Sequence, residues 1–221
     1  MAKDRRTGSR AVILHTDIVD STELVEQDKR LAYDRIQDTF GRFSSAIEKF
    51  QGLVIEIRGD ALIAEFKRAQ DAVSASLSFL VDQASYIERL KDGPQPEIRV
   101  GIAMGEIIIA DNTITGWGVV QAQRVEQLAD PGGVYITSAI GQALPEGFPI
   151  NIEILGEDTL RKFDYPDTMS VFRIKLKPGE SIPLPDETSQ LYSPQKTPRL
   201  KVAAIAIALI VAGGAAYWIN Y

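Results

Sequence analysis

The 221-residue sequence has no cysteine and one histidine, His15. Without cysteine the chain forms neither a disulfide nor a thiolate metal site. A single histidine nearly excludes a histidine-based zinc centre and a Ser-His-Asp triad. His15 lies near the end of a predicted strand, so we interpret it as a packing residue rather than as a catalyst.

Positive charge is also scarce: 24 Lys and Arg residues face 30 Asp and Glu residues, for a net charge of −6. No basic stripe interleaved with aromatic residues is present, which argues against a nucleic-acid partner. The hydrophobic fraction of 45% and the charged fraction of 24% are those of a foldable globular protein.

Charge is absent altogether from residues 202–219. A helix of that length spans about 27 Å, close to the hydrocarbon thickness of a bilayer. Lysine and arginine residues precede the run, and by the positive-inside rule the preceding domain is cytoplasmic. We therefore expect a proline-rich linker at residues 176–199 and a single-pass transmembrane helix at residues 200–221 in the cell membrane. The alternative is a buried core helix.

Two aspartates stand where predicted strands meet sharp bends. Asp17 ends the apolar run at residues 11–17, and Asp60 lies in a Gly-Asp turn. A charged carboxylate at the rim of a hydrophobic core costs free energy unless a nearby cation balances its charge. Two such carboxylates, brought together by the fold, make a hard-oxygen site for Mg²⁺ or Mn²⁺. Two-metal oxygen sites that also hold phosphates are typical of phosphoryl transfer.

Hydrophobic periodicity and turn residues predict alternating helices and strands. The predicted helices span residues 21–52, 69–90 and 116–128, with a short one from residue 137. The predicted strands span residues 11–17, 53–57, 61–66, 97–104, 107–110, 134–136, 152–155 and 169–174. Residues 105–106 are predicted as a hairpin turn. This order indicates an α+β sandwich, with helices on one face of a mostly antiparallel sheet.

Five segments occur in an order and spacing that point to one family: LHTDIVDST (14–22), IRGDALIA (57–64), IRVGIAMGE (98–106), GWGVVQAQR (116–124) and LGEDTLRKF (155–163). Together they resemble the catalytic domain of the class III adenylate/guanylate cyclases, a ferredoxin-like sandwich. The resemblance implies an N-terminal extension at residues 1–10 and a catalytic domain at residues 11–175. It also implies attack of a ribose 3′-hydroxyl on the α-phosphorus of a nucleoside triphosphate, with loss of pyrophosphate.

The resemblance also implies roles for single residues. Asp17 and Asp60, with the carbonyl of Ile18, match ligands of two divalent metal ions per site, Mg²⁺ or Mn²⁺. One ion lowers the pKa of the 3′-hydroxyl and the other holds the triphosphate. Arg124 aligns with the arginine that stabilises charge on the transferring phosphate. Arg161 falls where the family has a triphosphate-contacting lysine, although a solvated surface charge is an equal alternative.

The turn between the first strand and the first helix is expected to bind phosphate. Its backbone N–H groups lie at a helix start and can donate to phosphate oxygens. The residues of this predicted contact are Ile18, Val19, Asp20, Ser21 and Thr22.

In the resembled family the sheets pair head to tail, with active sites at the interface. A symmetric homodimer is therefore expected, in which Asp17 and Asp60 act with Arg124 and Arg161 of a second copy. Alanines recur every fourth residue from 204 to 216. They either form a ridge of small residues that lets two membrane helices approach closely, or reflect only the abundance of alanine in this run.

Three positions depart from the family pattern, namely Glu56, Thr113 and Val120. Adenylate cyclases usually have lysine at the first, Asp or Cys at the second, and a ribose-orienting asparagine at the third. An ionised Glu56 only accepts hydrogen bonds, and every base offers it a donor edge. A pyrimidine cyclase of antiphage signalling, forming cUMP or cCMP, and an adenylate cyclase with a different pocket both stay open. The remaining alternative is a degenerate cyclase domain that binds nucleotide or a partner without turnover.

Overall fold

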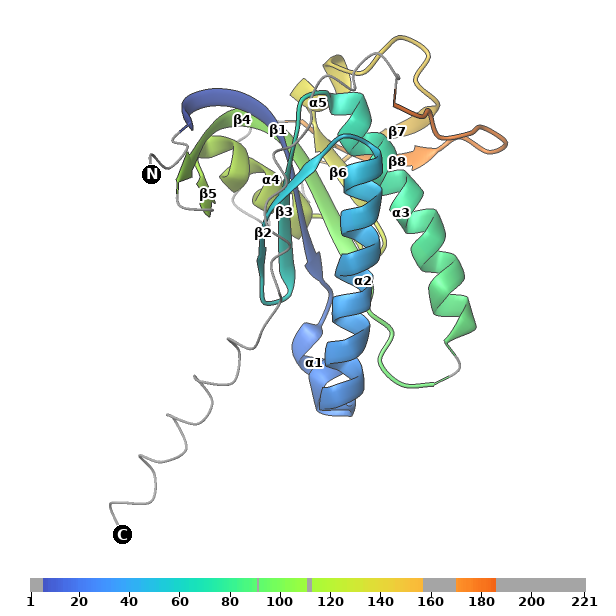
Figure 1. Ribbon diagram of the computed structural model, residues 1–221. Helices are drawn as coiled ribbons and strands as arrows, with labels where there is room; N and C mark the ends of the chain where they lie inside the picture. Colours follow the sequence, from blue (N-terminus) through green and yellow to red (C-terminus); the bar gives the residue numbers. More distant parts are fainter. Residues whose placement is uncertain (1–5, 91, 111–112, 157–169, 186–221) are drawn as a thin grey trace. The chain divides into compact units, whose positions relative to one another are not determined.

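The computed structural model describes residues 6–90, 92–110, 113–156 and 170–185 (Figure 1). The chain divides into two compact units, Met1–Ser189 and Gln190–Tyr221, and every described residue belongs to the first. Arg161, most of the expected linker and the expected transmembrane helix lie outside the described residues. Within the described ranges, no helix is both long enough and apolar enough to cross a bilayer.

Eight strands and five helices make up the described fold, all counted within the ranges given above. In chain order they are β1 (Arg6–Ile18), α1 (Ser21–Gln27), α2 (Lys29–Lys49), β2 (Leu53–Arg58), β3 (Ala61–Phe66), α3 (Ala69–Arg89), β4 (Ile98–Ala110), β5 (Thr113–Thr115), α4 (Trp117–Gln127), β6 (Val134–Thr137), α5 (Ser138–Gln142), β7 (Ile150–Ile154) and β8 (Val171–Leu176).

All the strands belong to one sheet, in the order β2-β3-β1-β4-β6-β8-β7, with β5 paired to β4. The pairs β2–β3, β3–β1 and β1–β4 are antiparallel. Together with α2 and α3, these four strands form the βαββαβ unit of a ferredoxin-like fold. Only β6 joins in parallel, beside β4. The predicted α+β class and mostly antiparallel sheet are therefore confirmed.

The helices cover both faces of the sheet, so the expectation of helices on one face was wrong. Figure 1 shows α2 and α3 on the near side of the sheet and α4 behind it. In β1, Val12 and Leu14 pack in the core that includes α2 and α3, whereas Ala11 and Ile13 pack with Ala122 of α4. Successive residues of a strand point to opposite faces of the sheet. A strand with consecutive apolar residues therefore needs other elements packed on both faces.

β4 is a single strand of 13 residues, and the hairpin predicted at residues 105–106 does not exist. Gly105 stands in this strand for a different reason. A Cβ on Gly105 would lie 2.6 Å from the Cα of Gly118, and one on Gly101 would lie 2.2 Å from the carbonyl oxygen of Ala122. Both glycines face α4, and their missing side chains let the helix backbone lie directly on the strand.

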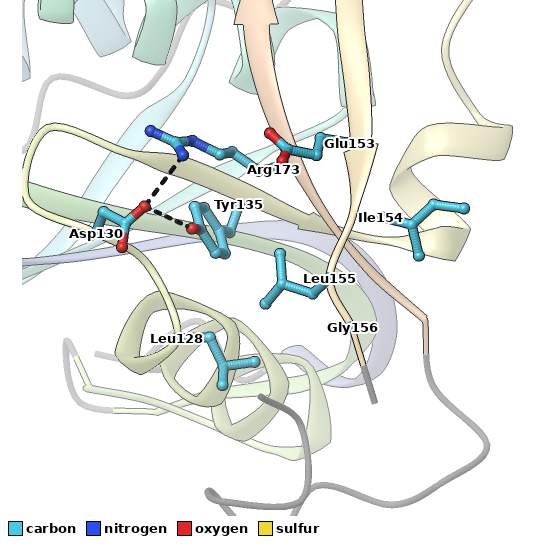
Figure 2. Close-up of a pocket in the computed structure, with 8 residues that line it drawn as sticks. All are labelled: Leu128, Asp130, Tyr135, Glu153, Ile154, Leu155, Gly156 and Arg173. Carbon is cyan, nitrogen blue, oxygen red and sulfur yellow. Dashed lines mark hydrogen bonds and ion pairs between the residues drawn. The ribbon is translucent and has the colours of Figure 1, made fainter. Parts of the chain in front are cut away.

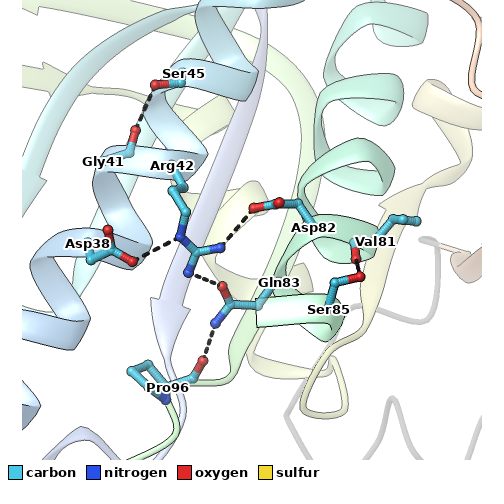
Figure 3. Close-up of polar contacts among 9 residues, drawn as sticks. All are labelled: Asp38, Gly41, Arg42, Ser45, Val81, Asp82, Gln83, Ser85 and Pro96. Atoms are coloured by element: carbon cyan, nitrogen blue, oxygen red, sulfur yellow. Dashed lines mark hydrogen bonds and ion pairs between the residues drawn. The ribbon is translucent and has the colours of Figure 1, made fainter. Parts of the chain in front are cut away.

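A polar cluster joins α2, α3 and the loop that leads into β4 (Figure 3). The guanidinium of Arg42 bonds to Asp82 at 2.9 Å and Gln83 at 2.5 Å, and it lies 3.8 Å from the ring centre of Tyr86. Gln83 in turn donates to the carbonyl of Pro96 at 2.6 Å. The cluster therefore fixes the start of β4, the strand that pairs with the Asp17 end of β1.

Candidate active site

The fold brings Asp17 and Asp60 to the same rim of the sheet. Asp17 is the penultimate residue of β1 and pairs with Ala61, which directly follows Asp60 at the start of β3. The N–H of Ile18 donates to the main-chain carbonyl of Asp60 at 2.9 Å. The hydroxyl of Ser21 donates to Oδ2 of Asp60 at 2.5 Å. Strand pairing and these two bonds fix the β2–β3 turn against the end of β1.

The surroundings of Asp17 disfavour a bare negative charge. Burial raises the pKa of its carboxyl, and the charges of Glu126 and Asp60 raise it further. The guanidinium of Arg99 opposes them through a hydrogen bond and its charge, yet the pKa remains raised. Neighbouring carboxylates thus create a negative potential that a divalent cation would relieve.

The donor set fits a hard cation. Carboxylate and carbonyl oxygens are the ligands of Mg²⁺ and Mn²⁺, and Mg²⁺ typically takes one or two carboxylates and completes its shell with water and phosphates. No group of three or more His, Cys, Asp or Glu side chains that could hold a metal occurs in the described part of the chain. Asp17, Asp60 and the carbonyl of Ile18 therefore suit an ion that completes its shell with water or with phosphate oxygens.

The predicted phosphate turn offers fewer backbone donors than expected. The N–H of Ile18 bonds to Asp60, and the N–H of Val19 bonds to the carbonyl of Glu97 at 2.9 Å. Asp20 follows in the left-handed region, with φ of 49°, and its side chain makes no capping bond to α1. The N–H groups of Ile18 and Val19 already have partners, so the expected phosphate contacts stay a prediction for the residues after Val19.

Cavities in the described part of the chain lie beside this turn and beside the strands β6, β7 and β8. A cavity of about 190 Å³ beside the turn is lined by Val19, Asp20, Glu23, Leu24, Gln27, Gln95 and Glu97. Its three carboxylates repel phosphate in the absence of a cation. A cavity of about 240 Å³ lies beside β6, β7 and β8, where Asp130 contacts Tyr135 and Arg173 (Figure 2). None of the predicted site residues lines this second cavity.

Arg124 lies on the opposite side of α4 from the sheet. The buried residues of α4 include Ala122 and Val125, whereas Arg124 is exposed. Trp117 and Val120 are also exposed, at 52% and 39%. These three residues, spaced i, i+3 and i+7, form one outward stripe on the helix. Within the described residues, the side chains of Asp17 and Asp60 bond to Arg99 and Ser21, on the other side of α4 from Arg124.

The two predicted base-reading residues lie on different strands. Glu56 is half-buried in β2, and its carboxylate forms an ion pair with Arg58 of the same strand. Thr113 is the first residue of β5 and pairs with Ala110 of β4. Glu56 therefore already has a cationic partner within its own strand.

Sequence reasoning missed two residues of the site, Arg99 and Glu126. One nitrogen of Arg99, Nη2, donates to both carboxylate oxygens of Asp17, at 3.1 and 3.0 Å. Nε of Arg99 lies 3.0 Å from Oε1 of Glu126, and Nδ1 of His15 lies 3.4 Å from Oε2 of Glu126. The Glu126 side chain is only 1% exposed. His15, expected to be a packing residue, is buried and lies against this carboxylate.

The fold and its two aspartates at one rim define a nucleotide-cyclase type of catalytic domain. The model of the adenylate and guanylate cyclase catalytic domain matches residues 5–172. The chain therefore belongs to this family, and the resemblance inferred from the sequence is confirmed.

Similar proteins agree with that assignment. A protein of Rhizobium meliloti (strain 1021) named "Putative adenylate cyclase 3" is 32% identical over 144 residues. That match covers 63% of this chain and 24% of the relative, so the chain spans about a quarter of its length. The crystal structure of an adenylate/guanylate cyclase/hydrolase from Silicibacter pomeroyi matches with a TM-score of 0.62 and 22% identity, over 80% of this chain and 99% of that one. The guanylyl cyclase Cya2 matches with a TM-score of 0.64 and 19% identity, over 83% of this chain and 100% of that one.

Proposed function

We propose that this chain is a nucleotidyl cyclase, which converts a nucleoside triphosphate into a 3′,5′-cyclic mononucleotide and pyrophosphate. Membership of the cyclase family supports the reaction class. The observation that carries the proposal is the placement of Asp17 and Asp60 at one rim, joined by the Ile18–Asp60 bond at 2.9 Å. These are the two positions that match the metal ligands of the family.

Asp17, Asp60 and the carbonyl of Ile18 would hold two divalent ions, which when bound lower the pKa of the 3′-hydroxyl and neutralise the triphosphate. Ser21 keeps the Asp60 carboxylate in place through its 2.5 Å bond. Residues of the turn after Val19 bind phosphate oxygens. Arg124 stabilises charge on the transferring phosphate, because a preorganised guanidinium matches that geometry.

The complete site needs two copies of the chain. Arg124 is exposed on the outward stripe of α4, with Trp117 and Val120. Tryptophan and arginine are enriched at the centres of protein–protein interfaces, so an exposed pair of them suggests such an interface. We therefore propose a symmetric homodimer in which each Asp17–Asp60 pair meets Arg124, and Arg161, of the other copy.

The base is decided by Glu56 and Thr113, and Val120 replaces the residue that usually orients the ribose. A carboxylate paired with Arg58 still accepts hydrogen bonds from a base edge, and adenine, cytosine and uracil all present such donors. We propose a cyclic pyrimidine nucleotide, cUMP or cCMP, or cAMP as product. A cUMP or cCMP product would support the antiphage role of pyrimidine cyclases, whereas a cAMP product would argue against it.

We further propose that residues 200–221 anchor the chain in the cell membrane, with the catalytic domain in the cytoplasm. The uncharged run at residues 202–219 supports this assignment. Fractionation of cells that express the full chain, or the chain ending at residue 199, tests it. Release of the full chain from membranes by high salt would contradict the anchor.

The direct test incubates the purified full chain with Mn²⁺ and each of the four common nucleoside triphosphates. We expect pyrophosphate release from at least one, with the cyclic product identified by mass spectrometry. Asp60→Ala should abolish turnover and keep the melting temperature, whereas Asp34→Ala, at an exposed position of α2, should leave both unchanged. No pyrophosphate from any nucleotide would end the proposal, and nucleotide binding without turnover would favour the degenerate domain.

A further inference from the structure

We infer that Arg99 is a positioning residue, which ties the metal-binding carboxylate of Asp17 to the helix that carries Arg124. This inference rests on the proposed function. Arg99 and Asp17 are directly opposite each other in the β4–β1 ladder. Nη2 of the guanidinium donates to Asp17, whereas Nε lies 3.0 Å from Oε1 of Glu126 in α4 as an ion pair without hydrogen-bond geometry. It therefore bridges the sheet and the helix at the point where the site is built.

Glu126 is the anchor of this bridge. Its side chain is 1% exposed, although it carries a carboxylate, and a buried carboxylate requires a partner. Nε of Arg99 lies 3.0 Å from its Oε1 and Nδ1 of His15 lies 3.4 Å from its Oε2, and both contacts lack hydrogen-bond geometry. Glu126 follows Arg124 by two residues on the same helix. A shift of Glu126 would therefore shift Arg124 as well.

The bridge depends on the shape of the guanidinium as well as on its charge. Arginine presents its nitrogens in a rigid planar fork, whereas lysine presents one point charge on a flexible stem. A lysine at position 99 can balance the charge of Asp17 or Glu126, but its one ammonium cannot occupy both the position of Nη2 at Asp17 and that of Nε at Glu126. Loss of a group that orients a metal-binding carboxylate typically lowers metal affinity or activity about 10- to 100-fold.

The test uses two substitutions that conserve charge and break the bridge. Arg99→Lys removes the fork, and Glu126→Asp shortens the anchor by one methylene. Arg173→Lys is the matched control, because Arg173 lies in β8 of the same sheet, is 32% exposed against 27% for Arg99, and is ion-paired to Asp130 at 3.3 Å. Mn²⁺ affinity is measured on the full chain without nucleotide, from the electron paramagnetic resonance signal of free Mn²⁺. Turnover is measured separately at saturating Mn²⁺ and nucleotide.

We expect each bridge variant to bind Mn²⁺ about tenfold more weakly and to lower kcat about 10- to 100-fold, with little change in the KM for nucleotide. Arg173→Lys should match the wild type. If Arg99→Lys and Glu126→Asp keep wild-type Mn²⁺ affinity and kcat, Arg99 only balances charge and the inference is overturned. Loss of the folded circular dichroism spectrum in both variants would also overturn it, because the pair would then serve the core alone.

The two readouts separate this inference from the proposed function. If the wild type releases no pyrophosphate from any nucleotide, the proposed function fails. The Mn²⁺ titration then decides the role of Arg99 by itself. If the wild type cyclises a nucleotide and Arg99→Lys behaves as wild type in both assays, the inference fails and the proposed function stands.

Discussion

At the scale of the residue, the ionised form of Asp17 lowers the stability of the fold. Burial, Glu126 and Asp60 raise the pKa of its carboxyl, and Arg99 only partly offsets them. The folded state therefore binds the proton of Asp17 more readily than the unfolded chain does. By linkage, the contribution of Asp17 to stability falls as pH rises from the ordinary value of 3.8 through the raised pKa. Above that range the ionised carboxylate lowers the free energy of unfolding of the metal-free protein, and the proposed cation would offset that loss.

The substitution Asp17→Asn should therefore stabilise the metal-free protein at neutral pH. Asparagine cannot ionise but keeps a side-chain oxygen that accepts from Arg99. We expect its melting temperature to exceed that of the wild type at pH 8 by more than at pH 5, with about 2–4 °C for each kcal/mol. Mn²⁺ should raise the melting temperature of the wild type and leave that of Asp17→Asn unchanged. A lower melting temperature of the variant at pH 8 would contradict this account.

The sequence was sufficient to place Asp17 and Asp60 at bends next to strands, because apolar runs lie beside both, while their metal-binding role stays a prediction. The bridge was not predictable in the same way. Arg99 occupies a strand position whose partner, Asp17, is 82 residues away, and only the β1–β4 register shows that they are opposite. Glu126 did carry a signal: it lies four residues after Ala122, on the buried face of α4. A charged residue on that face indicates a buried partner.

At the scale of the element, the contact between β4 and α4 depends on glycine. Gly101 and Gly105 remove the side chains that would otherwise hold the helix away from the strand. The prediction of a turn at residues 105–106 failed because a glycine in a strand has two explanations, a bend or a close approach of backbone. Periodicity along one segment cannot distinguish them, because the second explanation depends on a helix that follows later in the chain.

The substitution Gly101→Ala should weaken this contact. The new Cβ would lie 2.2 Å from both the Ala122 carbonyl oxygen and the Glu126 nitrogen, which are backbone atoms that cannot rotate away. Overpacking of this kind typically lowers the free energy of unfolding by about 1–3 kcal/mol. A urea titration measures the loss, and turnover should fall with it because Glu126 and Arg124 move together.

Gly41→Ala is the control for that experiment. Gly41 lies in α2, and a Cβ there meets nothing within 4 Å. Alanine is favoured over glycine in a helix by up to about 1 kcal/mol, so this variant should be as stable as the wild type or slightly more stable. Equal stability of Gly101→Ala and the wild type would show that α4 can move away without cost.

At the scale of the whole molecule, the described part of one chain places the proposed metal ligands at a rim of the sheet and Arg124 on the exposed side of α4. Asp17 and Asp60 are at the end of β1 and in the β2–β3 turn, while Arg124 is on the exposed stripe of α4 with Trp117 and Val120. Sequence alone could place both sets in family segments, yet their separation within one chain is visible only in the fold. The separation is what makes assembly a condition for catalysis in the proposed mechanism.

Mixing two inactive variants tests that condition. Asp17→Ala lacks a metal ligand and Arg124→Ala lacks the phosphate-stabilising cation, so each homodimer should be inactive in both of its sites. Random pairing of the two variants makes about half of the dimers mixed, and each mixed dimer has one intact site, which gives about a quarter of wild-type turnover. The control mixes Asp17→Ala with Asp60→Ala, because both substitutions fall on the same half of the site and no pairing restores it. Recovery in the first mixture alone would establish shared sites between two copies, whereas no recovery in either mixture, with both variants folded and dimeric, would contradict the proposed assembly.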